Sequence, residues 1–144
     1  MKSVFEYDIN IPREKLARLY ANPDNNIKWM HDLKKLEPIS GKTGQPGFRY
    51  RLIPKEGNMI FDATVVSRNL PDELKLNLEG SKTNVFVTGK FIALSRDKTK
   101  FISEEVFTFR GFFNKISGFL SRRAIKKAHQ THMNDFIKFA ITKK

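Results

Sequence analysis

One carboxylate in the C-terminal half of the chain stands among aromatic residues. Two-residue alternation places Glu105 on the strand face that also carries Phe107 and Phe109. A carboxylate directed into an apolar interior is costly to bury, so it must be paired, protonated or in contact with water inside a cavity. Glu105 is therefore a candidate for binding a ligand hydroxyl or for acid–base catalysis. The alternatives are a β-bulge that turns it outward and an ion pair with Arg122.

Two histidines lie three residues apart in the last segment of the chain. On a helix, His129 and His132 would occupy neighbouring positions, where two imidazoles can share a metal ion. Zinc sites need three or four ligands, however, and no local motif marks a third one. We therefore expect both histidines to form part of a cavity wall or a helix edge. We predict no metal site and no cofactor.

Other common catalytic arrangements are missing from the sequence. The chain has no cysteine, which excludes disulfides, thiolate metal sites and cysteine nucleophiles, and favours an intracellular location. A Gly-Lys-Thr begins at Gly41, but the upstream glycine of a phosphate-binding loop is absent. No serine follows the nucleophile-elbow pattern. The sequence therefore points to a binding site more than to a known reaction.

The middle of the chain has the periodicity of β-strands. Together with the start of the chain it contains seven alternating segments, at residues 3–10, 33–39, 48–52, 59–65, 74–79, 85–93 and 101–109. From residue 33 onward the connections between successive segments are short, which makes neighbouring strands antiparallel. One face of the alternating region is almost wholly apolar, so the strands should form a sheet with a single buried face.

Two short helices are expected between the first two strands. Pro12 can occupy the first position of a helix over residues 13–20, and Asn22-Pro23 ends that helix. A second short helix follows and carries Trp29.

The C-terminal segment has helical periodicity that changes phase. One apolar stripe covers residues 112–120, and a second one includes Ile125, Met133 and Phe136. Because glycine weakens a helix interior by about 1 kcal/mol, we expect a break or a change of partner near Gly118. The second stretch should dock on the sheet.

The formal net charge of +12 belongs mainly to the C-terminal segment. Residues 110–127 combine phenylalanines with lysines and arginines, which is typical of a helix at an acidic membrane surface. The alternative is that the phenylalanines are buried and the charges are only solvated. Nucleic acid is not a predicted partner, because exposed aromatic residues do not regularly alternate with the charges.

Size and hydropathy indicate one domain over residues 1–144 and a cytoplasmic location. A length of 144 residues is typical of one domain. Glu6 and Asp8 interrupt any signal pattern in the first ten residues, and no apolar run approaches the roughly 18–20 residues that span a bilayer.

Several short sequences occur in an order that is typical of one superfamily. They are Phe5–Ile9 running into Ile11–Leu16, Pro23-Asp24 before Trp29, Gly47 before a strand, and Gly111-Phe112-Phe113 before Arg122-Arg123. The chain thereby resembles the START-like, or Bet v 1-like (SRPBCC), superfamily, and most closely its polyketide cyclase/dehydrase-like branch. The resemblance implies an α+β helix-grip fold. In this fold a curved antiparallel sheet of about seven strands wraps around a long C-terminal helix, with two short helices after strand 1.

The resemblance also implies a function. Proteins of this superfamily enclose a cavity between the sheet and the long helix, so we predict binding or transport of a lipid-, sterol- or polyketide-like molecule without catalysis. The alternative is a polyketide cyclase/dehydratase-like enzyme that uses a cavity Glu or His as general acid/base. The residues expected to line the cavity are Trp29, Tyr50, Phe61, Leu76, Phe91, Glu105, Phe107, Arg122, Ile125, His129, Met133 and Phe136. No partner protein is predicted.

Overall fold

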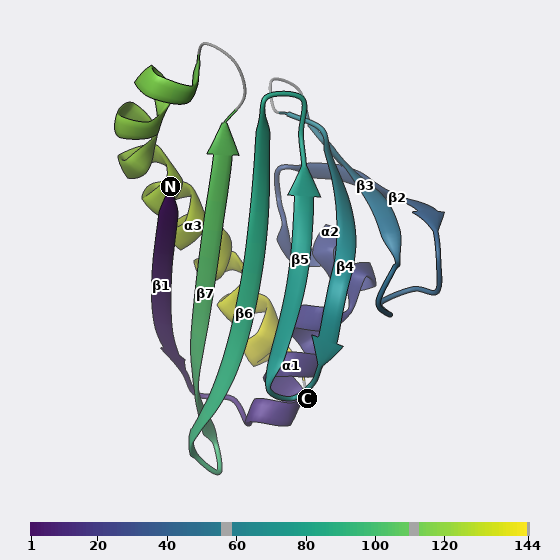
Figure 1. Ribbon diagram of the computed structural model, residues 1–144. Coiled ribbons are helices and arrows are strands. Elements are labelled where there is room, and N and C mark those ends of the chain that lie inside the picture. The colour runs from purple at the N-terminus through teal and green to yellow at the C-terminus, as the bar shows by residue number, and fades with distance from the viewer. Residues whose placement is uncertain (56–58, 110–112, 144) are drawn as a thin grey trace.

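The computed structural model describes the backbone of residues 1–55, 59–109 and 113–143, and the side chains of these residues except those of 113–122. The elements follow one another as predicted, with a strand, short helices, six further strands and a long helix (Figure 1). They are β1 (Lys2–Ile9), α1 (Arg13–Ala21), η1 (Pro23–Asn25), α2 (Asn26–Trp29), β2 (Leu33–Ser40), β3 (Arg49–Pro54), β4 (Phe61–Asn69), β5 (Glu73–Glu79), β6 (Thr83–Ser95), β7 (Lys98–Phe109) and α3 (Phe113–Thr142).

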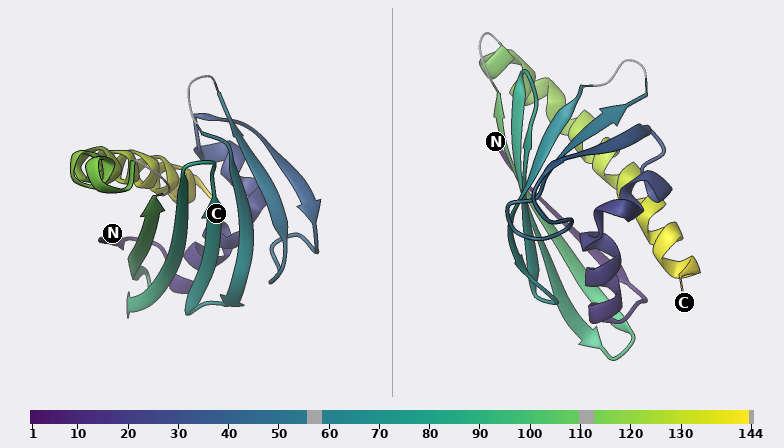
Figure 2. Two further views of the ribbon diagram at one scale, coloured as in Figure 1. Left: turned by 45° about the horizontal axis from the view of Figure 1, so that its top comes forward. Right: turned by 90° about the vertical axis from the view of Figure 1, so that its right-hand side faces the viewer.

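The seven strands form one antiparallel sheet in the order β1-β7-β6-β5-β4-β3-β2. The first strand pairs with the last along its whole length, from Lys2 opposite Val106 to Ile9 opposite Thr99. The two edges of the sheet are therefore β1 and β2. The sheet is curved, and the helices lie together on one side of it (Figure 2). This arrangement confirms the predicted helix-grip fold.

The alternating sequence explains which face of the sheet is buried. In β1, Val4 and Glu6 are exposed, whereas Phe5 and Tyr7 on the opposite face are shielded and Ile9 is buried. In β7 the same alternation buries Phe101 and Ser103. A strand with this pattern gains hydrophobic stabilisation in only one orientation, which fixes the side that the helices cover.

Two hydrophobic clusters form the core beneath the helices. One joins α1, α3 and the β6–β7 end of the sheet around Phe91, Phe101 and Phe136. The other joins β2, β3, β4 and β5 around Phe48 and Leu74. Tyr20, Met30 and Leu70 pack against both clusters.

The conformation of α3 differs from the expectation at one point. The helix runs without interruption from Phe113 to Thr142, so the first predicted alternative near Gly118, a backbone break, is wrong. The second alternative, a change of packing partner, concerns side chains outside the described ones. A helix of 30 residues tolerates the cost of one glycine, about 1 kcal/mol. The second apolar stripe is confirmed, since Met133, Phe136 and Ala140 are buried against the sheet side.

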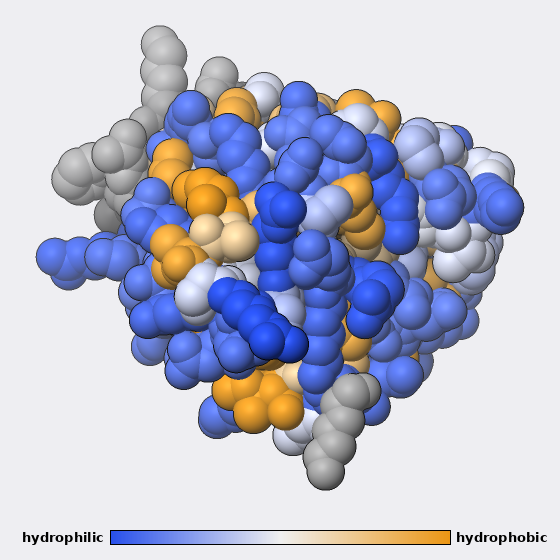
Figure 3. Space-filling view, turned by 90° about the horizontal axis from the view of Figure 1, so that it is seen from below, coloured by the Kyte–Doolittle hydropathy of each residue, from blue (hydrophilic) through white to orange (hydrophobic). Residues whose placement is uncertain are grey.

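Seen from below, the described surface of the molecule is mainly hydrophilic (Figure 3). Hydrophobic residues there form small separate areas among hydrophilic ones (Figure 3). Among the described residues, none of the helices combines the length and the apolar character that crossing a bilayer requires. The Gly-Lys-Thr sequence lies between two strands, β2 and β3, and not between a strand and a helix as a phosphate-binding loop does.

Candidate ligand-binding site

A cavity of about 140 Å³ lies between the sheet and the helices. Its sheet wall consists of apolar side chains from β3 to β6, including Leu52, Val65, Leu74 and Val87. Its opposite wall comes from α1, η1, α2 and α3. The lining includes Tyr20 and Met30, which touch both core clusters, so the cavity lies where the clusters meet.

The volume limits what the cavity can hold. An apolar cavity of about 150 Å³ is large enough to admit benzene. Pockets for drug-sized ligands have volumes of about 300–1,000 Å³. The cavity of about 140 Å³ therefore has room for one ring, and a sterol would not fit in it as it stands.

Two ionisable side chains face each other in the cavity lining. Nε2 of His129, on α3, lies 3.3 Å from Oε1 of Glu105, on β7. Their side chains are only 9% and 15% exposed. The register of β7 is regular on both sides of Glu105, opposite Ser3 and Val87. Glu105 thus points inward without a bulge, and its close partner is a histidine.

Tyr7 completes this polar group from the edge strand β1. Its hydroxyl oxygen lies 2.8 Å from Nδ1 of His129, within hydrogen-bond distance. The ring of Phe5 stacks on the same imidazole at 3.9 Å between ring centres, with an angle of 8° between the planes. If the Tyr7 hydroxyl donates to Nδ1, a neutral imidazole carries its proton on Nε2, directed at Glu105. This tautomer satisfies both contacts.

The three tyrosines near the cavity stay neutral at physiological pH. Burial raises the pKa of Tyr50 to about 12, and a side-chain hydrogen bond with Asn26 works against that rise. Burial and the nearby Glu105 carboxylate raise the pKa values of Tyr7 and Tyr20 above the ordinary phenol value. Tyr20 and Tyr50 line the cavity, so they offer it neutral hydroxyl groups.

The second histidine of the pair turns to a different partner. Nε2 of His132 lies 3.5 Å from Oδ1 of Asp32, in the segment between α2 and β2. Nε2 of His31, in the same segment, lies 3.7 Å from Oδ1 of Asp135 on α3. His129 and His132 therefore do not converge on one point, and the described residues contain no group of three or more His, Cys, Asp or Glu side chains that could hold a metal ion.

The structure brings half of the predicted cavity residues together. Those that line the cavity are Trp29, Tyr50, Leu76, Glu105, His129 and Met133. Phe91 and Phe136 are instead packed in the core cluster that adjoins the cavity. Phe107 stacks on Phe109, and Phe61 lies next to Gly80.

Two further predicted residues belong to α3. Ile125 is partly buried but is not among the described residues of the cavity lining. Arg122 lies outside the described side chains, as does most of segment 110–127.

Several residues of the site were missed because their role depends on a tertiary contact. Tyr7 alternates with Glu6 and so shares a strand face with Phe5, but nothing local indicates that it meets His129. Tyr20 lies in a predicted helix, and the sequence does not say that this part of the helix meets the sheet at the cavity. A search for polar groups on inward-facing strand positions would have found Tyr7.

Solved structures are similar to this one over nearly the whole chain, although no protein-family model and no curated protein matches the sequence. A START superfamily protein from Mycobacterium smegmatis has a TM-score of 0.82 at 10% identity, with 96% of each chain covered. Ara h 8.0201 has a TM-score of 0.76 at 14% identity, covering 99% of this chain and 100% of that one. Norcoclaurine synthase from Thalictrum flavum, in complex with dopamine and hydroxybenzaldehyde, has a TM-score of 0.76 at 14% identity, covering 100% of this chain and 89% of that one. These likenesses show a shared fold.

Proposed function

We propose that this chain, which has the START-like, Bet v 1-like fold, binds a hydrophobic small molecule about one ring in size. The observation that carries the proposal is the cavity of about 140 Å³ with mainly apolar walls and, among its described lining residues, one carboxylate, Glu105, paired with His129. Most small-molecule sites have this composition, with apolar walls for affinity and a few polar groups for orientation.

The cavity walls suggest how such a ligand would be held. Leu74, Leu76 and Val87 would contact the faces of the ring, because they line the cavity from neighbouring strands. A hydroxyl on the ring could donate a hydrogen bond to the Glu105 carboxylate. The hydroxyls of Tyr20 and Tyr50 could donate to a carbonyl or ether oxygen.

The size of the cavity selects among the predicted ligand classes. A polyketide-like or phenolic ring fits the available volume, whereas a sterol needs more space. The dopamine and hydroxybenzaldehyde named for the norcoclaurine synthase structure are both single-ring molecules, which supports a ligand of this size in the shared fold.

Calorimetric titration with 4-hydroxybenzaldehyde would test this proposal. Val65 lines the cavity at 3% exposure, whereas its neighbour Val66 is 45% exposed on the outer face of β4. Val65→Phe should fill the cavity and abolish binding, and Val66→Phe should leave binding unchanged. Equal binding by both variants, or no binding by the unaltered protein, would refute the proposal.

Acid–base catalysis is the second candidate function. The contact between His129 and Glu105 supports it, because a carboxylate and an imidazole at 3.3 Å can pass a proton between them and a bound substrate. Turnover of ketide substrates that falls by at least tenfold in Glu105→Gln, with substrate binding retained, would favour the enzyme. Unchanged turnover would exclude this role for Glu105.

The location and the domain organisation also remain proposals. We propose that the chain acts in the cytoplasm, on the ground that it contains no cysteine. We further propose that residues 1–144 fold as one unit, since the first strand, β1, pairs directly with the last strand, β7.

A further inference from the structure

An external groove lies beside the cavity and shares one wall with it. The groove has a volume of about 460 Å³ and runs between α3 and the segment that joins α2 to β2. Its lining includes Ala124, Ala128 and Thr131 of α3. Among the described residues, His132 alone lines both the groove and the cavity. Its imidazole therefore separates the two spaces.

The contacts of His132 allow it to move. Its side chain is 38% exposed, and its charged partner Asp32 is 47% exposed. An ion pair as exposed as this one contributes little to stability. On the cavity side, the imidazole meets the edge of the Trp29 ring, at 6.4 Å between ring centres. Rotation of the His132 side chain toward solvent would break these two weak contacts and join the cavity to the groove.

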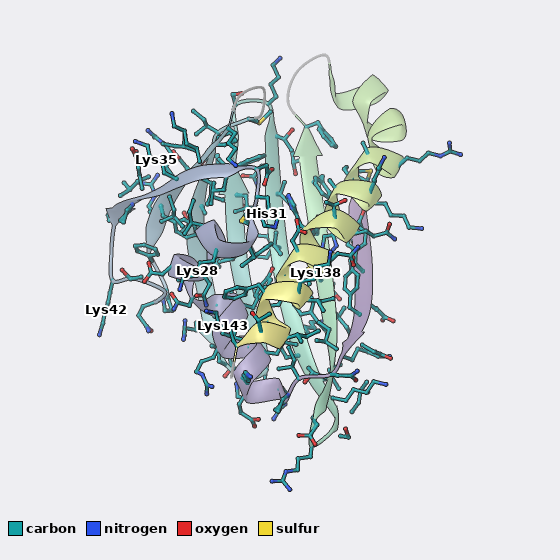
Figure 4. The ribbon with its side chains drawn as sticks, turned by 180° about the vertical axis from the view of Figure 1, so that it is seen from behind. Lys28, His31, Lys35, Lys42, Lys138 and Lys143 are labelled. Atoms are coloured by element: carbon teal, nitrogen blue, oxygen red, sulfur yellow. The ribbon has the colours of Figure 1, made fainter. Side chains whose placement is uncertain are left out.

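The groove itself favours a hydrogen-bonding occupant over a carboxylate. Asp32 and Asp135 carry negative charge, and Lys127 carries positive charge, along the same lining. The view from the helix side shows His31 above α3, with Lys138 further along the helix (Figure 4). Because two aspartates stand against one lysine, a carboxylate in the groove would be repelled. A hydroxyl or an amide can pair with groups of either sign.

We infer that cavity and groove form one binding site for an amphiphile, with an apolar ring in the cavity and a hydrogen-bonding tail, free of carboxylate, that passes His132 into the groove. This inference rests on the proposed function, because it requires that the cavity binds the ring. It adds the class of ligand and the route by which a molecule larger than the cavity is accommodated. Ala124 and Ala128 suit this role, since their small side chains leave the groove open.

The test compares a ring alone with the same ring carrying a tail. 4-Methylphenol is the ring probe, and 6-(4-hydroxyphenyl)hexan-1-ol is the tailed probe. Each methylene removed from water strengthens binding by roughly fourfold, so two shielded methylenes give at least about tenfold tighter binding of the tailed alcohol. The corresponding carboxylic acid should bind at least threefold more weakly than the alcohol.

Two variants of α3 locate the tail. Ala128→Phe fills the groove and leaves the cavity lining intact, so it should remove the tenfold gain while 4-methylphenol still binds. Gln130→Phe adds the same ring at an exposed position outside the groove and should change neither affinity. Retained binding of 4-methylphenol also shows that each variant is folded.

The outcomes separate the inference from the proposed function. If 4-methylphenol binds and the alcohol binds no tighter, the inference is overturned and the proposed function stands. A tighter complex with the acid than with the alcohol overturns the assignment of a tail free of carboxylate. If neither probe binds, both the inference and the proposed function are refuted.

Discussion

The imidazole of His129 lies 3.3 Å from the carboxylate of Glu105 and joins the long helix to the last strand. Both side chains are nearly buried, and both line the cavity. The hydroxyl of Tyr7 adds a contact from the edge strand. One polar group thus connects three elements that are far apart in the chain, at the place where a ligand would need a hydrogen-bonding partner.

Removing His129 should be costly for stability. His129→Leu leaves the Glu105 carboxylate in an apolar wall without its partner and removes the contact to Tyr7. Breaking a buried pair typically costs about 3–5 kcal/mol, and the residual exposure of Glu105 reduces this to about 2 kcal/mol. Unfolding in urea measures this decrease in the free energy of unfolding.

The matched control is the Lys90–Glu104 pair on the outer face, at 3.4 Å. Lys90→Met should lower the free energy of unfolding by less than about 1 kcal/mol, because that pair is more exposed. Equal losses in His129→Leu and Lys90→Met would show that the inner pair has no special role.

Removing the hydroxyl of Thr99 and removing that of Ser103, both on β7, should change the free energy of unfolding differently. Thr99 is fully buried, and its hydroxyl donates a hydrogen bond to the carbonyl of Ile11 at 2.7 Å. Thr99→Val should therefore destabilise the protein by about 1 kcal/mol. The hydroxyl of Ser103 is buried too, but it has no hydrogen-bond partner in the described part of the chain. Ser103→Ala should be neutral or stabilising, and a loss as large as that of Thr99→Val would mean that Ser103 has a partner after all.

Stability should fall in strongly alkaline solution because of Tyr50. Its pKa in the folded protein is about 12, above the ordinary value of 10.0. The unfolded chain therefore loses this proton first as the pH rises, so the contribution is complete below pH 10 and is lost between about pH 10 and 12. Two pKa units correspond to about 2–3 kcal/mol. Unfolding free energies measured from pH 9 to 12 should decline less steeply in Tyr50→Phe, and an unchanged slope would contradict the assignment.

The basic residues should attract acidic surfaces to the helix side. The helices carry ten lysines and arginines against Glu14, Asp24 and Asp135 as their acidic residues. Several of the other lysines on that side, among them Lys35, Lys42 and Lys143, point outward in Figure 4. We expect binding to vesicles that contain anionic lipid at low salt, and a steep loss of binding as salt is raised.

Charge reversal would locate this contact. The double variant Lys126→Glu, Lys127→Glu on α3 should weaken sedimentation with anionic vesicles at least tenfold, and Lys98→Glu, Lys100→Glu on β7 should have little effect. Binding that does not depend on salt, or an equal effect of both double variants, would refute a contact through the helix side.

The sequence predicted the elements well because their signals are local. The alternation of Phe5 and Tyr7 with Val4 and Glu6 is enough to define a strand and its buried face. Two-residue periodicity also placed Glu105 on the inner face of its strand. The position of a side chain along the inner face, beside the cavity or in the packed core, cannot be read from a local pattern. Phe91 was for this reason predicted to line the cavity, although it packs in the core beside it.

The partner of Glu105 could not be deduced for a related reason. Arg122, the partner that the sequence suggested, lies seven residues before His129 on α3, or about two helical turns, and its side chain lies outside the described residues. Whether His129 reaches Glu105 depends on how far the helix is shifted along the sheet. That shift is set by the packing of Met133 and Phe136 in the core cluster, and no short stretch of sequence encodes it.

The methionines offer the most direct test of a one-ring cavity. Met30 and Met133 line the cavity, whereas Met1 lies at the start of β1 outside its described lining. In a spectrum of protein labelled with ¹³C at the methionine methyl groups, titration with 4-hydroxybenzaldehyde should shift Met30 and Met133 in a saturable manner and leave Met1 in place. Methyl signals of Met30 and Met133 that do not move at saturating aldehyde would contradict a ligand-binding cavity in this protein.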